Sequence, residues 1–206
     1  GLNVLFLFDS ITRFAEAHRE TALLAGETPA LNAFPPSTVR VVSELAERTG
    51  PGTDGKGDIT AIYSVLVAGS DMEEPVADMI RGILDGHIIL DRDIAERGRY
   101  PAIDVLRSVS RSLPHAATED ENALIRECRR MFALYEEIAP MLRANLYEFG
   151  KDAEADRAIA LYSLLDHYAG TPNSQGIEAA FDQLREILRT ERSLAAQALP
   201  ATPIDP

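Results

Sequence analysis

The sequence lacks the residues on which several classes of protein depend. Its 206 residues include no tryptophan and a single cysteine, Cys128. One cysteine excludes an internal disulfide framework and a zinc site built from cysteines. The four histidines are scattered without the spacing of a metal-binding motif. No G-x-S-x-G nucleophile elbow occurs either, which argues against an α/β-hydrolase.

Positive charge is also scarce, with 20 Lys and Arg against 33 Asp and Glu and a net charge of −13. This balance argues against a broad nucleic-acid surface and favours basic partners. The densest apolar run, residues 4–8, is strand-sized and far too short to span a membrane. No signal peptide is visible, so we expect a cytoplasmic protein. An apolar fraction of 46% is enough to build a core.

The first part of the chain alternates predicted strands with predicted helices. Apolar or β-branched runs predict strands at 4–8, 59–67 and 87–90. Helical periodicity predicts one helix that stops at Gly26. A second helix is predicted to begin after Ser37 as its N-cap and to end at Gly50. This alternation indicates an α/β fold with a parallel sheet over residues 1–114.

The pattern changes after residue 114. Thr118 and Glu121 form a capping-box sequence at the start of a predicted helix. Apolar residues then recur every three or four positions, which places them on one helix face. These residues are Leu124, Cys128, Met131, Tyr135, Ile138 and Leu142. Two further helices are predicted around residues 159–165 and 177–188. We therefore expect an all-α domain over 115–199, followed by a proline-rich tail at 200–206.

One stretch imitates a phosphate-binding loop. Gly50, Gly55 and Lys56 have the spacing G-x-x-x-x-G-K, but Gly57 stands where a P-loop needs Ser or Thr to bind magnesium. The stretch also leads into a predicted strand, whereas a P-loop opens a helix whose N-terminus faces the phosphates. It is therefore interpreted as a connection between a helix and a strand.

Asp9 follows the apolar run at residues 4–8, which is the pattern of a Walker B motif. In P-loop proteins such an aspartate helps to hold magnesium at the carboxyl end of the sheet. The motif alone is weak, because an aspartate at this position can also simply cap the next helix.

The surrounding sequence is far more specific than this motif. "LFLFDSITRFAEAHRETALLAGETPALNAFPPS" resembles the flagellar and type III secretion export ATPases, which are homologues of the catalytic subunit of F-type ATP synthase. The resemblance continues through "GKGDITAIYSVLVAGSDMEEPVADMIRGILDGHIILDRDIAERGRYPAID" and "SVSRSL". It is close over about the first 115 residues and looser afterwards. It implies a partial RecA-like ATPase core followed by a C-terminal helical domain, and a homo-hexamer that binds ATP and Mg2+ between subunits.

The resemblance also implies roles for individual residues. Asp9 corresponds to the Walker B carboxylate that serves the metal, and Arg13 faces the region of the γ-phosphate. Tyr100 stacks on the adenine, and Arg111 is the arginine finger that enters the neighbouring subunit's site. The alternatives are a surface arginine for Arg13, a half-buried turn residue for Tyr100, and a helix-start or surface arginine for Arg111.

Two acidic stretches resemble partner surfaces of the same family. Residues 69–75 correspond to a loop that faces the central pore, and residues 147–157 to a turn that approaches a central coiled-coil stalk. The carboxylates expected to meet a basic stalk are Asp71, Glu73, Glu74, Asp152, Glu154 and Asp156. Solvated acidic turns are the alternative for each side chain. The family further implies export substrates and chaperones as partners, and a position at the periphery of the inner membrane.

In this family the P-loop and the catalytic glutamate precede the Walker B strand, where this chain begins. We therefore expect these residues alone to be inactive and to expose an apolar face of the sheet. Two other functions stay open. One is a segment of an F- or V-type rotary ATPase, and the other is a non-catalytic helical module that binds a stalk or regulator. The choice between a flagellar and a virulence secretion system also stays open, with a preference for the flagellar one.

Overall fold

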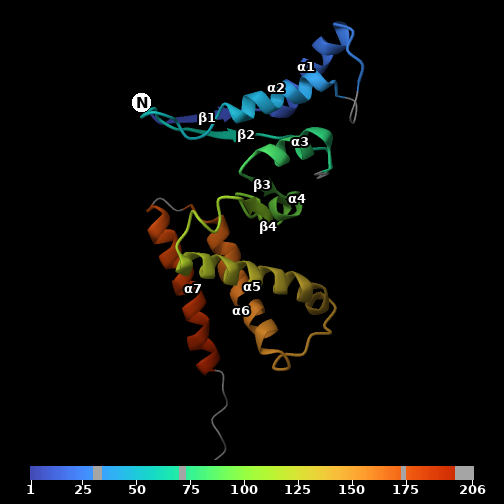
Figure 1. The fold of residues 1–206 in the computed structure, drawn as a ribbon. Helices are drawn as coiled ribbons and strands as arrows, with labels where there is room; N and C mark the ends of the chain where they lie inside the picture. The colour runs from blue at the N-terminus through green and yellow to red at the C-terminus, as the bar shows by residue number, and fades with distance from the viewer. Residues whose placement is uncertain (30–33, 70–72, 173–174, 198–206) are drawn as a thin grey trace, which may run out of the picture. The chain divides into compact units, whose positions relative to one another are not determined.

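The computed structural model describes residues 1–29, 34–69, 73–172 and 175–197, with side chains up to residue 189 (Figure 1). The predicted tail at 200–206 lies outside these residues. The chain divides into two compact units, residues 1–87 and 88–206. The predicted domain boundary at residue 114 stays a prediction.

The first unit is built on two parallel strands. β1 (Val4–Phe8) pairs with β2 (Ile59–Tyr63) so that Val4 lies opposite Ile59 and Phe8 opposite Tyr63. The helices of this unit are α1 (Ile11–Leu24), α2 (Pro36–Glu47) and α3 (Pro75–Ile83). The parallel pairing confirms the predicted sheet type, although β2 is shorter than the predicted strand at 59–67.

Only one face of this strand pair is packed. Phe8 and Tyr63 pack against a cluster of buried residues from the helices. These core residues are Ile11, Ala15, Phe34, Val42, Ala46, Val76 and Ile80. Because strand side chains alternate, Leu5, Leu7 and Ile62 lie on the opposite face. They are 62%, 65% and 57% exposed, so this face of the sheet is open and apolar, as expected from the sequence.

The start of α2 differs from the prediction. Pro35 is the N-cap residue and Pro36 the first helical residue, so Ser37 lies inside the helix. Proline suits the first helical position because its backbone nitrogen has no hydrogen to satisfy and its φ angle is already helical. The helix therefore begins earlier than a serine cap implies, and it ends at Glu47 rather than at Gly50.

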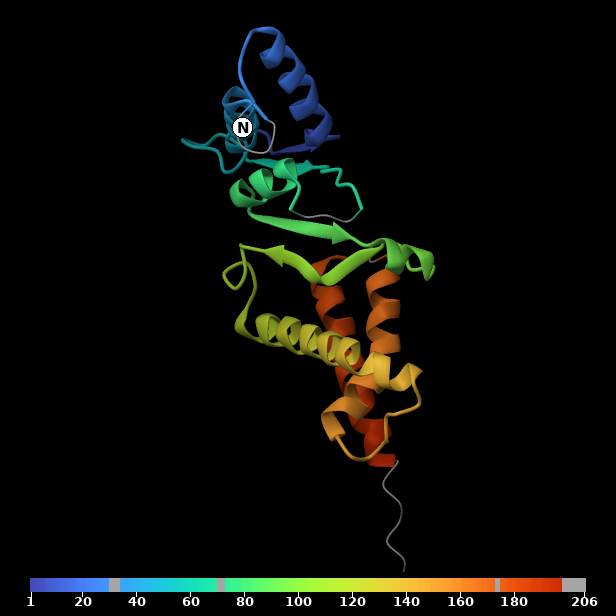
Figure 2. The same cartoon turned by 90° about the vertical axis from the view of Figure 1, so that its right-hand side faces the viewer.

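The second unit combines a strand pair with three long helices. β3 (Gly86–Leu90), which begins just before the unit boundary, pairs with β4 (Ile103–Ser110), and the two run in opposite directions (Figure 2). The short α4 (Arg92–Glu96) lies between them in the chain. The predicted helices are present as α5 (Glu119–Arg143), α6 (Ala153–Gly170) and α7 (Ile177–Gln197). β4 was not predicted.

The helices of the second unit share one hydrophobic core. Its buried members are Cys128, Met131, Phe132, Ala158, Leu161 and Leu165, from α5 and α6. The capping box at the start of α5 is confirmed, since the Thr118 side chain accepts from the backbone N–H of Glu121 and the Glu121 carboxylate accepts from that of Thr118.

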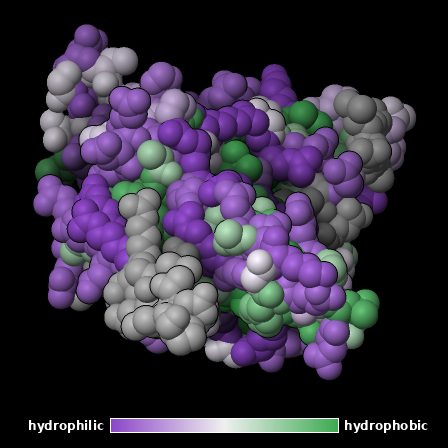
Figure 3. All heavy atoms as spheres, turned by 90° about the horizontal axis from the view of Figure 1, so that it is seen from below, coloured by the Kyte–Doolittle hydropathy of each residue, from purple (hydrophilic) through white to green (hydrophobic). Residues whose placement is uncertain are grey.

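The face drawn in Figure 3 is mostly hydrophilic, with small separate hydrophobic groups. None of the described helices is both long and apolar enough to cross a membrane.

Candidate functional site

Asp9 lies at the carboxyl end of β1 and is exposed. The backbone of Ser64, which follows β2, brackets it: the Ser64 N–H donates to Phe8 O (2.9 Å) and Ser64 O accepts from Ile11 N–H (2.9 Å). The next residue, Ser10, is buried and is the N-cap of α1. Asp9 therefore projects from a short turn whose backbone is fixed on both sides.

Arg13 lies one turn into α1, on the exposed side of the helix. Its backbone N–H donates to the Ser10 side chain (3.4 Å), while Ile11 and Ala15 face the core. The preceding residue, Thr12, bonds to the backbone after β2: its hydroxyl accepts from Leu66 N–H (2.9 Å) and donates to Leu66 O (3.2 Å). These bonds connect the segment after β2 to the start of α1, which explains why the strand ends early.

Tyr100 stands on the turn between α4 and β4, and its side chain is 67% exposed. The neighbouring Arg99 side chain is only 10% exposed and pairs with Asp166 of α6 (2.9 Å). Its guanidinium also donates to Pro101 O (3.3 Å) and Ile103 O (2.9 Å). The exposed ring of Tyr100 thus stands on a turn that the half-buried Arg99–Asp166 ion pair anchors.

Arg111 directly follows β4 and is exposed. The turn after it is held to the start of α5 by Asn122, whose amide donates to Pro114 O (2.8 Å), Ala117 O (3.0 Å) and Thr118 O (2.9 Å). Asp9 and Arg13 belong to the first unit, and Tyr100 and Arg111 belong to the second. Each unit therefore carries two of the four residues.

Of the residues predicted for the pore-facing loop, Asp71 lies outside the described residues. Glu74 is the cap residue of α3, and its carboxylate accepts from Ala68 N–H (3.0 Å). Glu73 lies 3.9 Å from Arg81 in an ion pair. Both described carboxylates therefore have partners within this loop and helix.

The acidic turn before α6 is more highly organised than a solvated loop. Asp152 is the N-cap of α6 and accepts from Glu154 N–H (2.9 Å) and Ala155 N–H (3.1 Å). Asp156 accepts from the Tyr147 hydroxyl (2.7 Å) and from Gly150 N–H (2.8 Å).

These contacts also affect a neighbouring phenol. Burial and the hydrogen bond to Asp156 together raise the pKa of Tyr147 to about 12, since a phenolate would face a carboxylate. Glu154 pairs with Arg130 of α5 (2.7 Å). Asp152 and Asp156 therefore hold the turn, and Glu154 links α6 to α5.

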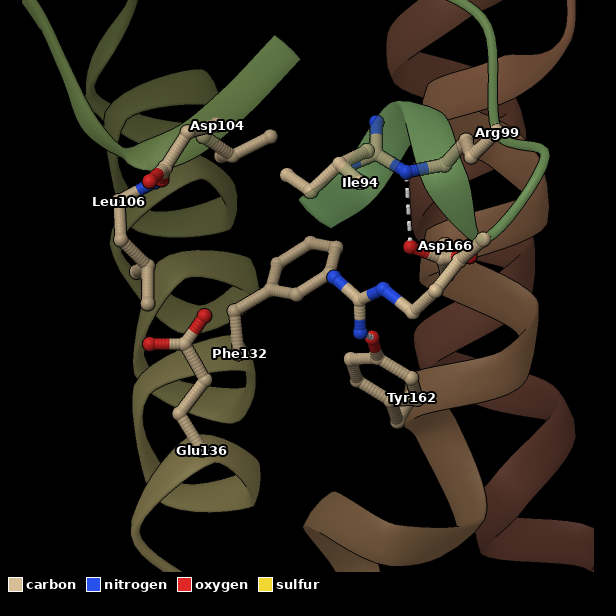
Figure 4. A pocket seen from close by; sticks show the side chains of 10 residues that line it. Ile94, Arg99, Asp104, Leu106, Phe132, Glu136, Tyr162 and Asp166 are labelled. Atoms are coloured by element: carbon tan, nitrogen blue, oxygen red, sulfur yellow. Dashed lines mark hydrogen bonds and ion pairs between the residues drawn. The ribbon is translucent and has the colours of Figure 1, made fainter. Parts of the chain in front are cut away.

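A small cavity lies between α4, β4, α5 and α6 (Figure 4). Ile94, Phe132 and Tyr162 line it, and the Arg99–Asp166 pair closes one side. Its volume of about 20 Å³ holds a single water, so it excludes a nucleotide. Among the residues that the structure describes, no group of three or more His, Cys, Asp or Glu side chains is arranged to hold a metal ion.

Sequence reasoning missed the residues that hold the predicted site side chains in place. These are Thr12, Arg99 and Asn122. Thr12 bonds to the backbone of Leu66 and Arg99 pairs with Asp166, both distant in sequence, whereas Asn122 bonds to the turn just before its own helix. A single sequence therefore carries no signal for them, and each resembles an ordinary polar residue of a helix or turn.

Parallel strands joined by helices, with a polar residue at the carboxyl end of a strand, are typical of ligand-binding α/β domains, and comparison with known families identifies this one. Residues 1–110 match the nucleotide-binding domain of the ATP synthase alpha/beta family, and the chain belongs to that family. Residues 117–188 match the C-terminal domain of the EscN ATPase of type III secretion systems. The two matches place the chain in the branch of this family that sequence analysis identified.

Individual relatives agree with this assignment. The flagellum-specific ATP synthase of Helicobacter pylori is 43% identical over 191 residues, which are 92% of this chain and 44% of that protein. The assembled ATPase EscN of the type III secretion system of enteropathogenic E. coli has a TM-score of 0.84 and 36% identity, covering 90% of this chain and 45% of EscN. EscN in complex with its central stalk EscO has a TM-score of 0.77 at the same identity, covering 90% of this chain and 44% of EscN. The chain thus spans less than half the length of these relatives.

Proposed function

We propose that this chain is a segment of an ATP-hydrolysing motor that powers protein export through a flagellar or type III secretion apparatus. One observation carries the proposal: a parallel strand ends in an exposed aspartate directly before a capped helix, within the region that matches the nucleotide-binding family. Ligands of open α/β sheets bind at this carboxyl edge. A cytoplasmic location at the inner membrane belongs to the same proposal.

Asp9 suits a magnesium-bound nucleotide. Magnesium keeps several waters and is usually bound through one or two carboxylates together with substrate phosphates, so a single exposed carboxylate fits. The ion, when bound, neutralises charge on the phosphates. Asp9 would orient its water ligands, and Arg13 would contact the γ-phosphate. The ring of Tyr100 would stack on the adenine, which its exposure permits.

The groups that cradle the phosphates are proposed to lie elsewhere in the full-length protein. The only G-x-x-x-x-G-K stretch, at residues 50–56, leads into β2, and Gly57 offers no hydroxyl. Phosphoryl transfer depends on such positioned groups. We therefore expect no magnesium-dependent ATPase activity from these 206 residues alone, and such activity, lost in Asp9→Ala, would contradict this part of the proposal.

Arg111 is proposed to act in a neighbouring subunit of a homo-hexamer. An arginine finger stabilises charge that develops on the transferred phosphoryl group, and it raises kcat by about 10³–10⁵. A contact of this kind is head-to-tail, and it closes into a ring when the rotation fits. The site would then combine Asp9 of one subunit with Arg111 of the next.

Mixing two inactive variants of the full-length protein tests this arrangement. Asp9→Ala and Arg111→Ala are each expected to abolish ATPase activity. When equal amounts are mixed and allowed to exchange subunits, about a quarter of the head-to-tail interfaces carry both native residues. We therefore expect activity to return on mixing. Continued inactivity in mixed hexamers would show that Arg111 does not serve a neighbour's site.

The turn at 147–157 is proposed to contact a basic coiled-coil stalk, with export substrates and chaperones as further partners of the assembly. The structure of EscN with its stalk EscO supports a stalk as partner. Because Asp152, Glu154 and Asp156 are already engaged within this unit, their charge would aid encounter more than affinity.

A further inference from the structure

The middle of β4 departs from a regular strand. The Asp104 side chain accepts from the N–H groups of both Leu106 and Arg107 (2.9 Å each). The Ser108 hydroxyl donates to Asp104 O (2.5 Å) and accepts from Ile89 N–H of β3 (3.0 Å). Side chains therefore replace backbone partners here, and several strand carbonyls need donors from another source.

Arg129 of α5 supplies those donors. One terminal nitrogen of its guanidinium donates to Val105 O (2.5 Å) and Ser108 O (3.1 Å), and the other donates to Leu106 O (2.8 Å). The fork of an arginine can satisfy several carbonyls at once, whereas the ammonium of a lysine acts as a point charge.

Both ends of this contact are fixed. Arg129 lies beside Cys128 on α5, whose apolar face forms the core of the unit. The side chains of Val105 and Leu106 pack against the same core while their carbonyls bond to Arg129. The guanidinium therefore joins the backbone of β4 to a helix that contributes three residues to the core, Cys128, Met131 and Phe132.

Arg111 lies three residues after Ser108, the last residue whose carbonyl bonds to Arg129. Three extended residues span at most about 10 Å, so the direction in which the chain leaves Ser108 limits the positions that the Arg111 side chain reaches. A finger must meet the transferred phosphoryl group accurately, because a displacement of about 1 Å can reduce the rate roughly 100-fold.

We propose that Arg129 is a positioning residue for the arginine finger, because its guanidinium fixes the carbonyls of β4 from which Arg111 projects. The inference rests on the proposed function of Arg111. Arg129 itself touches no substrate, and its effect falls on the transition state, where the finger acts, rather than on binding of ATP.

The test uses the full-length protein and three variants. Arg129→Met removes the donors and keeps an unbranched apolar side chain. Arg126→Met is the matched control, since Arg126 is an exposed residue on the same helix. Arg111→Ala tests the finger itself. ATPase kinetics and binding of ADP with aluminium fluoride, a transition-state mimic, are measured on assembled hexamers.

We expect Arg129→Met to lower kcat about 10- to 100-fold and to weaken binding of ADP with aluminium fluoride by a similar factor, with KM for ATP unchanged. Arg126→Met should match the native protein. Hydrogen exchange should accelerate at residues 105–111 in Arg129→Met and remain unchanged in α6. A general loss of structure would instead accelerate exchange in α6 as well.

The outcomes separate the two proposals. If Arg111→Ala abolishes activity while Arg129→Met behaves like Arg126→Met, the positioning role is wrong and the finger stands. If Arg111→Ala retains activity, the finger and therefore the positioning role are both wrong. If Arg129→Met does not assemble, Arg129→Lys takes its place. A lysine variant that assembles with native kcat overturns the inference, and one with reduced kcat and unchanged KM supports it.

Discussion

Replacing Asp152 by alanine is expected to destabilise the second unit through the loss of a helix cap. The Asp152 carboxylate accepts from two backbone N–H groups at the start of α6, those of Glu154 and Ala155. Losing such a cap costs about 1 kcal/mol, within a range of roughly 0.5–2. In a unit of this size, that change lowers Tm by about 4 °C.

The control is Asp152→Asn, which keeps an oxygen acceptor and removes the charge. Asparagine caps helices about as well as aspartate, so this variant should melt within about 2 °C of the native protein. Binding to a basic stalk should depend on the charge and not on the cap. The association rate should therefore fall in both variants, although only Asp152→Ala loses stability.

Thermal unfolding is followed by far-ultraviolet circular dichroism, because the chain has no tryptophan to report on it. The association rate is measured at two salt concentrations, since screening weakens a charge effect but leaves a cap intact. Equal destabilisation by alanine and asparagine would refute the capping argument. A native melting curve for Asp152→Ala would refute it as well.

Three further predictions concern packing and exposure. Leu161→Ala, at a fully buried position, should cost about 2–5 kcal/mol in urea unfolding, and a cost below 1 kcal/mol would contradict its place in the core. Burial raises the pKa of the Cys128 thiol from 9.0 to about 11. Alkylation of Cys128 at pH 8 should therefore be about 100-fold or more slower than in urea-unfolded protein, because less of the reactive thiolate is present. Comparable rates would show that the thiol is accessible. Leu7→Lys should reduce light scattering from self-association, because it places a charge on the open face of the sheet beside Leu5 and Ile62. Unchanged scattering would show that self-association uses another surface.

The elements that the sequence predicted correctly are those with strong local patterns. β1 is an uninterrupted apolar run, and α5 has a capping box and a regular apolar stripe. Local signals failed where a competing local preference prevailed. At α2, Pro36 in the first helical position outweighed Ser37 as a cap.

β4 escaped prediction for a different reason. Asp104, Arg107 and Ser108 interrupt its apolar residues, so the strand shows no clear alternation. Its irregular middle is stable because the Asp104 side chain satisfies two of its amides and Arg129, more than 20 residues away, satisfies its carbonyls. No pattern within the strand records a partner on a distant helix.

The same division applies to the candidate site. Asp9, Arg13, Tyr100 and Arg111 are candidates that the sequence indicates through family motifs, and all four are exposed in the structure. Exposure suits side chains that are proposed to contact a nucleotide or a neighbouring subunit. An exposed side chain on a loose loop, however, would not be held in one orientation toward that partner.

Accuracy must therefore come from the backbone beside each of these residues. Buried Ser10 holds the turn at Asp9, the Arg99–Asp166 ion pair holds the turn at Tyr100, and Arg129 holds the strand before Arg111. Each anchor satisfies backbone groups or a buried charge, so replacing it should disturb geometry without removing a reacting group. Loss of kcat with retained nucleotide binding is the kinetic signature expected for the anchor before the finger, whereas weaker nucleotide binding is expected for the one beside Tyr100.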